Sequence, residues 1–348
     1  MIRHIRTRLC GGGALALLVV TIGCGAPGIS EKELRDRASQ YVRAAARFPD
    51  NPAVRAQAME AMSEVMRDQA SLFLREGLKD EHPGVRFAAC MALGELADRD
   101  ARPVVQPLVG DPDGSVRVAA YFALEKMGDY SHRRAWRDAL ASAADPAVRR
   151  NAALAMGRLG NKSLIPLLAR ASTADDDEGV RLQAFEAMAL LGDAQATEQF
   201  LHDAFGGRGF KQPFALLTLG RVDTDPVRSV LRARLRNAPY IEARLAAARA
   251  LGMQHCDDGY DLSSQALTWN QPQRDVPDDP PELQVMRVRS MAALALGQIG
   301  RQDALPALKQ VMESEDDSRV QLAAATAILM ILNPAPSPVG GSATRVAS

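Results

Sequence analysis

The chain has 348 residues, of which 47% are hydrophobic but only 5% aromatic, and much of the apolar content is alanine. Alanine is the best helix former, and runs of strand-forming residues are absent after residue 30, so the composition indicates an all-α protein. The 42 basic residues balance the 42 acidic ones. This balance argues against a protein that binds nucleic acid through a basic surface.

Residues 1–23 have the features of an export signal. Three arginines precede an apolar stretch that is too short to span a bilayer. The sequence at 21–24, Thr-Ile-Gly-Cys, resembles a bacterial lipobox, although that family usually has leucine where Thr21 stands. The resemblance implies cleavage before Cys24 and lipidation of Cys24. A plain signal peptide or an uncleaved N-terminal anchor is the alternative.

The resemblance also implies a location in the cell envelope, with residues 24–29 as a lipidated tether. In enteric bacteria an aspartate after the lipidated cysteine retains the protein in the inner membrane. Here Gly25 follows Cys24, which favours the outer membrane, facing the periplasm.

From residue 30 to 332 one pattern recurs every 31 or 32 residues, with a single longer step of 45. Counted from the first residue of each copy, alanine stands at offset 4 in all nine copies, and aliphatic residues or methionine stand at offset 8. Offsets 0, 4, 7, 8 and 11 form one stripe of an α-helix. The copies begin at Val54, Val85, Val116, Val148, Val180, Lys211, Ala243, Val288 and Val320.

Start and stop signals define these helices. Pairs such as Asn51-Pro52 and Asp145-Pro146 fit an N-cap followed by proline in the first turn. Glycines such as Gly160 and Gly300 at offset 12 suit a left-handed helix end. A second apolar stretch lies between successive copies, so each unit is predicted to be two antiparallel helices. The first helix is predicted to run from Ser30, with a capping box, to about Phe48.

This pattern resembles HEAT repeats of the short type found in phycobilisome-lyase-like proteins. The resemblance implies an all-α solenoid of nine helical hairpins, whose end units act as caps. Nine stacked units should form an open arc of roughly 80 Å with the repeated helices on the concave side.

Two segments depart from the pattern. The long step places an insertion at about residues 268–283, which contains four prolines and Trp269. A long loop in a compact array is often functional, although a solvated spacer is an equal alternative. Residues 333–348 are predicted to be a disordered tail.

Arginine recurs at offset 1 of seven copies. These side chains form either a basic strip for acidic ligands or, as we favour, a structural ladder bonded to acids in adjoining turns such as Asp80, Asp111 or Asp145. The predicted ladder comprises Arg55, Arg86, Arg117, Arg149, Arg181, Arg244 and Arg289.

Aromatic side chains at offsets 2, 5 and 6 are expected near the groove, where exposed rings often mark a binding surface. Packing between repeats is the alternative for them. The candidate binding surface comprises Phe87, Tyr121, Phe122, Phe185 and, in the insertion, Trp269.

Enzyme motifs are lacking. None of the five histidines lies in the His-Glu dipeptides that bind iron in HEAT-like deoxyhypusine hydroxylase, and no hydrolase, P-loop or zinc motif occurs. We therefore expect no catalytic, cofactor or metal site, and a scaffold that binds a protein or peptide in the periplasm. The alternative is an accessory or lyase-like factor for chromophore or cofactor attachment.

Overall fold

The structure is a computed structural model that describes residues 29–206, 211–272 and 279–334, apart from the side chain of Asp68. Within these ranges the chain forms eighteen α-helices, five short 3-10 helices and no strand. The prediction of an all-α solenoid of nine hairpins is confirmed. The signal segment, Cys24 and most of the predicted tail lie outside the described residues.

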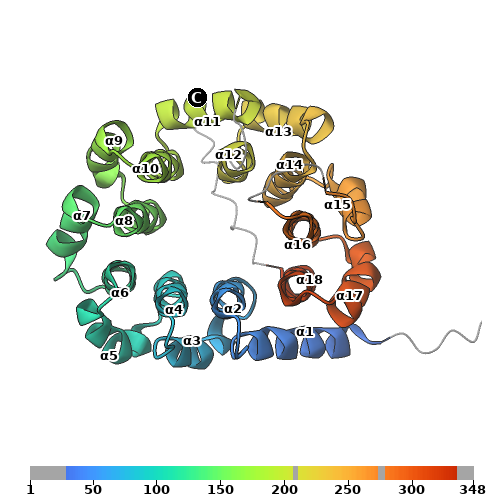
Figure 1. The fold of residues 1–348 in the computed structure, drawn as a ribbon, viewed down its shortest axis with the longest axis horizontal. Coiled ribbons are helices and arrows are strands. Elements are labelled where there is room, and N and C mark those ends of the chain that lie inside the picture. The colour runs from blue at the N-terminus through green and yellow to red at the C-terminus, as the bar shows by residue number, and fades with distance from the viewer. Residues whose placement is uncertain (1–28, 207–210, 273–278, 335–348) are drawn as a thin grey trace, which may run out of the picture.

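The helices alternate between two concentric layers (Figure 1). The inner layer holds the repeated helices: α2 (Pro52–Val65), α4 (Pro83–Glu95), α6 (Gly114–Lys126), α8 (Pro146–Leu159), α10 (Glu178–Leu190), α12 (Lys211–Leu219), α14 (Ile241–Met253), α16 (Pro281–Ile299) and α18 (Ser318–Leu332). The outer layer holds α1 (Glu31–Ala45), α3 (Ser71–Gly77), α5 (Arg102–Val105), α7 (Arg133–Ser142), α9 (Ile165–Ala174), α11 (Ala194–Gly206), α13 (Asp225–Asn237), α15 (Tyr260–Ala266) and α17 (Leu305–Ser314).

Short 3-10 helices form part of several outer elements. They are η1 (Arg67–Gln69), η2 (Arg99–Ala101), η3 (Gln106–Gly110), η4 (Lys162–Leu164) and η5 (Gln302–Ala304). We number the units from 1 to 9 along the chain, each as one outer element and the inner helix that follows it. Unit 3 has an outer element made of η2, α5 and η3 rather than one continuous helix.

The predicted capping residues act as expected. The side chain of Asn51 accepts a hydrogen bond from the amide of Val54 at 3.2 Å, and that of Asp145 accepts from the amide of Ala147 at 2.8 Å. At the other end, Gly160 and Gly300 both have φ of 77°. Only glycine adopts this left-handed conformation readily, so it ends the helix at a fixed position.

The nine units close into a ring (Figure 1). Unit 1 packs directly against unit 9: the Tyr41 hydroxyl lies 2.5 Å from Oε1 of Gln321, and Arg35 donates to the carbonyl of Leu332 at 3.2 Å. Arg37 also pairs with Glu313 at 3.1 Å across this contact. The expectation of an open arc with capped ends is therefore wrong, because each end of the array buries the other.

Small residues in the inner layer explain the curvature. A methyl group on Gly157 of α8 would lie 2.8 Å from the Cα of Ala187 in α10, and one on Gly297 of α16 would lie 2.8 Å from the Cα of Ala327 in α18. Inner helices therefore approach one another backbone to backbone on the inside of the ring. Each unit turns by roughly 40° as a result, and nine such turns complete a circle.

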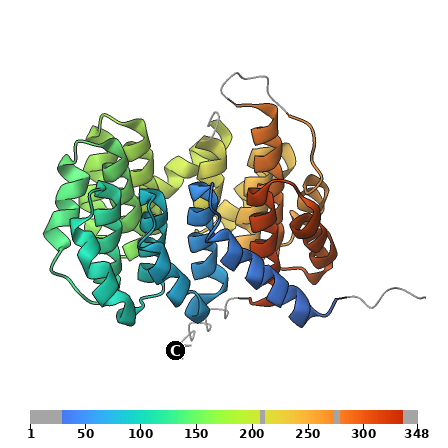
Figure 2. The ribbon, with the colours of Figure 1, turned by 60° about the horizontal axis from the view of Figure 1, so that its bottom comes forward.

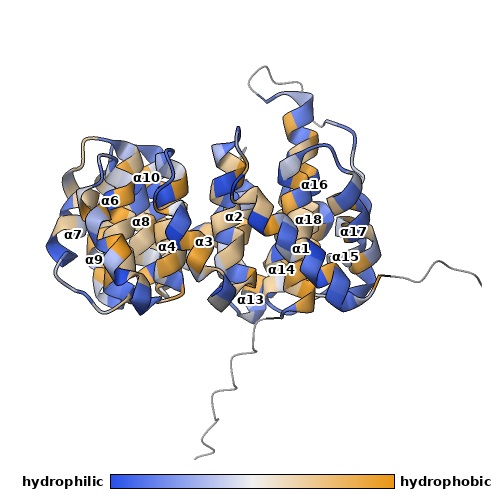
Figure 3. Ribbon diagram, turned by 90° about the horizontal axis from the view of Figure 1, so that it is seen from below, coloured by the Kyte–Doolittle hydropathy of each residue, from blue (hydrophilic) through white to orange (hydrophobic). Residues whose placement is uncertain are grey.

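The parallel inner helices give the ring two distinct faces. The N-terminal ends of the inner helices and the described parts of the insertion, 269–272 and 279–283, form what we call the insertion face. The C-terminal ends of the inner helices form the opposite face, which we call the tether face. Helix α1 runs obliquely to α2 and begins on the tether face, where α18 ends (Figures 1 and 2). The first turns of α16 rise above the neighbouring helices on the insertion face (Figures 2 and 3).

Candidate functional site

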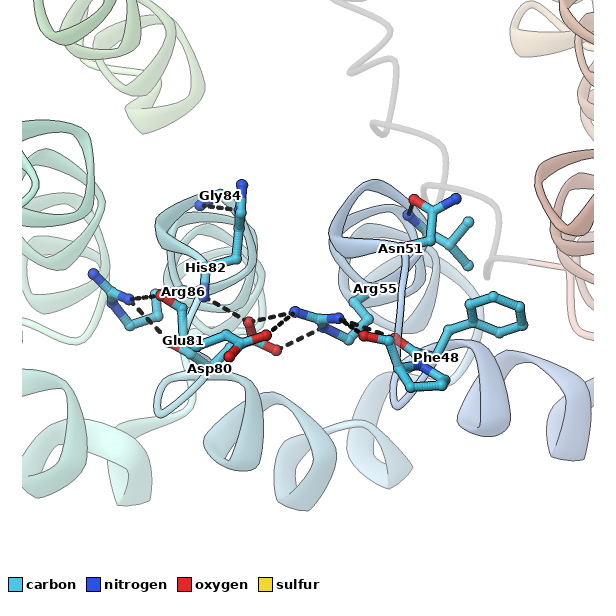
Figure 4. Close-up of polar contacts among 10 residues, drawn as sticks. Phe48, Asn51, Arg55, Asp80, Glu81, His82, Gly84 and Arg86 are labelled. Atoms are coloured by element: carbon cyan, nitrogen blue, oxygen red, sulfur yellow. Dashed lines mark hydrogen bonds and ion pairs between the residues drawn. The ribbon is translucent and has the colours of Figure 1, made fainter.

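The arginine ladder is a structural device. Arg55 of unit 1 donates two hydrogen bonds to the carboxylate of Asp80 in unit 2, at 2.8 and 2.9 Å, and two more to the carbonyls of Phe48 and Pro49 (Figure 4). Arg86 repeats this arrangement one unit further on, with Asp111. Each arginine thus joins the turn of its own unit to the turn of the next.

The ladder continues with variations. Arg149 pairs with Asp175 at 2.7 Å, and Arg289 pairs with Glu315 at 2.8 Å. The other three predicted members bind backbone carbonyls, at distances of 2.7 to 2.9 Å: they are Arg117, Arg181 and Arg244. Asp145, which the sequence suggested as a ladder partner, is the N-cap of α8 instead.

The ladder removes these arginines from the candidate binding residues. The side chain of Arg55 is 8% exposed and that of Arg149 is 15% exposed. Hydrogen bonding to Arg149 holds the pKa of Asp175 below its usual value. The guanidinium groups are therefore already occupied by carboxylates and carbonyls of the chain itself.

The aromatic groove patch does not form as predicted. Phe122 is fully buried, and its ring lies so close to Gly94 of α4 that even a methyl group there would collide with it. Tyr121 points to the outer layer, where its hydroxyl donates to the carbonyl of Val109 and its ring stacks on His132. The expectation that Phe122 is partly exposed is wrong, because the curvature of the inner layer presses offset 6 of α6 against α4.

The other predicted aromatic residues are half-buried. Phe87 and Phe185 pack against the core. Trp269 also packs there, and its backbone carbonyl accepts a hydrogen bond from Arg289 at 2.7 Å. Trp269 lies in the part of the insertion that the structure describes. Residues 281–283, which we assigned to the inserted loop, instead form the first turn of α16.

Polar side chains of inner helices that are two units apart meet inside the ring. Arg158 of unit 4 lies 3.7 Å from Glu95 of unit 2, and Gln298 of unit 8 donates to Glu64 of unit 1 at 2.9 Å. Further charged groups of units 1, 5, 6 and 7 lie within electrostatic range of this set: Glu60, Glu186, Arg221, which follows α12, and Arg249.

Enclosure by the ring changes how these groups ionise. It raises the pKa of Glu60 and of Glu186 above the usual range for glutamate, and it lowers the pKa of Arg249. The sequence carried a signal for this set, since polar residues stand at offset 10 in six of the nine copies, although at offset 6 in only four. We missed it because an open arc would leave those positions in solvent. The centre holds both signs of charge, and the contacts of Arg158 with Glu95 and of Gln298 with Glu64 link inner helices that are two units apart.

The insertion face carries a cleft of about 390 Å³ between units 8 and 9. Val285 and Met286 of α16 contribute apolar side chains to it, and Glu282 and Asp316 are exposed carboxylates at its edge. Nearby on this face, large apolar side chains are exposed in three consecutive units, 6 to 8: Phe205, Tyr240 and Leu283.

Both described ends of the insertion are held in place beside this cleft. Arg289 donates to the carbonyl of Trp269 and to Glu315, which joins the insertion to unit 9. Arg287 donates to both oxygens of Asp279, at 3.1 and 2.9 Å. A cleft fixed in this way loses little conformational entropy when it binds a partner.

The described part of the chain contains two cysteines. Cys90 and Cys256 are free thiols; Cys90 is buried, and burial raises the pKa of its thiol. Within the described ranges, no three His, Cys, Asp or Glu side chains gather in a way that could hold a metal ion. Among the same residues, no helix combines the length and apolar character needed to cross a bilayer.

The repeat pattern matches the family model for HEAT repeats over residues 71–133, 133–205 and 284–331, more than half of the chain. The chain belongs to the HEAT-repeat family. A search of curated proteins found no match.

Several solved structures have similar folds, among them one of the phycobilisome-lyase-like kind that the repeat pattern resembles. Human deoxyhypusine hydroxylase is 16% identical with a TM-score of 0.38, covering 86% of this chain and 96% of its own. The complex of CpcE and CpcF of phycocyanin lyase from Nostoc sp. PCC7120 is 20% identical with a TM-score of 0.42, covering 68% of this chain and 94% of its own. Kap121p bound to Nup53p is 14% identical with a TM-score of 0.33, covering 85% of this chain and 37% of its own. Nothing about function follows from likenesses at this level.

Proposed function

We propose that this HEAT-repeat protein is a non-catalytic scaffold that binds a partner protein through its insertion face and is held at the bacterial cell envelope by a lipid on Cys24. The observation that carries the binding role is the cleft between units 8 and 9. It combines an apolar floor, Val285 and Met286, with exposed carboxylates at its edge.

The chemistry of the cleft defines the kind of partner. Apolar side chains supply most of the free energy of protein association, and charges at the edge select the partner and its orientation. Glu282 and Asp316 are both exposed, whereas Arg289 is engaged with Glu315. The cleft therefore suits a segment that presents apolar residues flanked by lysine or arginine.

The tether supports this arrangement. Ile29, the first described residue, lies five residues after Cys24 and precedes α1, which begins on the tether face. A lipid on Cys24 would hold that face toward the bilayer. The insertion face, with the cleft, would then point away from the membrane toward proteins of the periplasm.

Capture of partners from detergent-solubilised membranes, with the intact lipoprotein as bait, tests the binding role. Met286→Asp places a charge on the floor of the cleft and should reduce capture of specific partners at least tenfold, about 1.4 kcal/mol. Leu283→Asp is the control, because Leu283 is exposed on the same helix and does not line the cleft. Equal capture by wild type and Met286→Asp would refute the cleft as the binding site.

Membrane fractionation tests the anchor separately. Stable attachment needs two acyl signals, which a modified lipobox cysteine normally supplies. Cys24→Ala should therefore release the protein from membranes or block its processing. Fractionation of this variant with membranes, as for wild type, would show that the anchor is not a lipid on Cys24.

A further inference from the structure

A second cleft lies where the ring closes, and we call it the junction cleft. Helices α1, α2 and α18 meet there (Figure 1). The cleft has a volume of about 630 Å³ and is lined by α1, by the turn after α2 and by the residues that follow α18. Three arginines line it: Arg35 and Arg43 of α1, and Arg67 of η1. Among the described side chains of the lining, Asp36 is the one carboxylate, so positive charge is in excess.

The three arginines of the junction cleft form no ion pair with a described carboxylate. Arg35 donates to the carbonyl of Leu332 at 3.2 Å, and Arg43 donates to Oε1 of Gln69 at 3.0 Å. The Nε atoms of Arg35 and Arg43 are buried, and neither has a hydrogen-bond partner in the described part of the chain. Arg67 is exposed. A guanidinium group carries five N–H donors, so each of these side chains keeps donors for a ligand.

Neighbouring arginines of unit 1 differ in this respect. Arg37, on α1, pairs with Glu33 at 2.7 Å and with Glu313 at 3.1 Å. Arg47, just after α1, pairs with Glu76 at 2.6 Å. The acids of these pairs neutralise arginines that lie outside the junction cleft.

Helix ends reduce the positive charge of the junction cleft without cancelling it. Both α2 and α18 end beside the cleft, and a helix C-terminus carries about half a negative charge. Two such ends together offset about one arginine. Three arginines and one aspartate therefore still leave the cleft with net positive charge.

Uncharged donors lie among the arginines. Arg35, Ser39 and Arg43 are spaced four residues apart, which places them on one face of α1. Gln40 also lines the cleft. The hydroxyl of Ser39 and the amide of Gln40 can donate hydrogen bonds to an anion that the guanidinium groups attract.

We propose that the junction cleft binds a phosphate-bearing anion. A guanidinium group forms two parallel hydrogen bonds with phosphate oxygens, and hydrogen bonds between ionised groups are stronger than neutral ones. One guanidinium suffices for a carboxylate, whereas three suit a dianion with three terminal oxygens. The cleft is larger than a phosphate group alone, so it also admits a phosphate ester with its substituent. The site is separate from the cleft between units 8 and 9 and does not depend on the lipid anchor.

Binding would strengthen the closed ring. Arg35 and Arg43 belong to unit 1 and Arg67 to unit 2, and Arg35 already contacts the last residue of α18 in unit 9. An anion held among these arginines would reduce their mutual repulsion at the closure. A ligand that binds only the folded chain also raises its melting temperature.

Calorimetric titration of the full chain with inorganic phosphate tests the site. Arg43→Gln combined with Arg67→Asn should weaken binding at least tenfold. Asparagine is chosen because Arg67 has φ of 46°, a left-handed conformation that asparagine tolerates. Arg67→Asn alone changes one exposed turn residue and should weaken binding severalfold, which keeps the test decisive if the double variant does not fold.

Arg47→Gln is the matched control. The guanidinium groups of Arg43 and Arg47 lie 5.6 and 5.1 Å from the centre of the same Phe73 ring, but Arg47 pairs with Glu76 and does not line the junction cleft. This variant should bind phosphate as wild type does. Phosphate should also raise the melting temperature of wild type and of Arg47→Gln more than that of the double variant.

Two further ligands distinguish the source of the phosphate. They are sn-glycerol 3-phosphate and dihexanoyl phosphatidylglycerol, the latter below its critical micelle concentration. Tighter binding of the lipid would support the site and identify a lipid headgroup, and tighter binding of inorganic phosphate or glycerol phosphate would support it and identify a soluble ligand. The proposal is overturned if none of the three ligands gives saturable binding, if acetate binds as tightly as phosphate, or if Arg47→Gln loses as much affinity as the double variant.

Discussion

The close packing of the inner helices can be tested by adding a single methyl group at Gly157. Gly157→Ala adds a methyl group that would lie 2.8 Å from the Cα and 3.0 Å from the Cβ of Ala187. Alanine is intrinsically better than glycine inside a helix by about 0.5–1 kcal/mol. Overpacking costs about 1–3 kcal/mol, and here the obstacle is backbone, so α8 and α10 must move apart to relieve it. We therefore expect a net loss on the order of 1–2 kcal/mol.

Urea unfolding followed by circular dichroism measures this loss. Gly84→Ala is the matched control, because its methyl group would meet only the ring of His82 in the same turn, at 3.1 Å. The control should unfold at the wild-type midpoint or slightly above it. A Gly157→Ala protein as stable as wild type would refute the argument that backbone contact between inner helices sets the curvature of the ring.

Three further predictions concern charged groups. Arg149→Ala should cost about 2–3 kcal/mol in urea unfolding, because the largely buried carboxylate of Asp175 loses its arginine partner, whereas Arg117→Ala, which loses bonds to carbonyls, should cost about 1 kcal/mol. Arg149 lowers the pKa of Asp175, so this stabilisation is present above the ordinary aspartate pKa and is lost as the pH falls through the lowered value. Wild type and Arg149→Ala should therefore have similar free energies of unfolding in acid. A difference that stays constant with pH would contradict the pairing. Burial raises the pKa of Glu186, so its contribution to stability is present below the ordinary glutamate pKa and is lost as the pH rises through the raised value. The difference in melting temperature between Glu186→Gln and wild type should therefore be more positive at pH 7 than at pH 4. The opposite trend would show that the charge of Glu186 is stabilising.

The sequence was sufficient to predict the units and their layers. The alanines at offset 4, such as Ala152 and Ala324, are fully buried, as the stripe of apolar offsets requires. The capping residues and the glycine stops define the ends of the inner helices because each acts through its own turn. The same locality explains why the ladder could be predicted: the arginine and its acid occupy fixed positions in adjacent repeats.

The sequence was not sufficient to predict features that depend on the sum of many units. Curvature accumulates from small differences between inner and outer spacing, and no single unit shows whether nine of them close. Phe122 illustrates the consequence within one repeat. Its position at offset 6 was expected to face an open groove, but the close approach of α4 and α6 at Gly94 buries the ring.

Closure also explains two features that an open solenoid would leave unaccounted for. Helix α18 ends in an apolar run with no glycine stop, and Ile328 and Leu329 are fully buried. The last unit of an open array would expose such residues. Here α18 packs against α1 and α2, which cover them. Polar side chains of the inner helices also meet across the ring: Arg158 of unit 4 lies 3.7 Å from Glu95 of unit 2, and Gln298 of unit 8 donates to Glu64 of unit 1 at 2.9 Å. The second of these contacts spans the junction where unit 9 meets unit 1. An open array would keep those helices far apart, so the contact exists only because the ring closes.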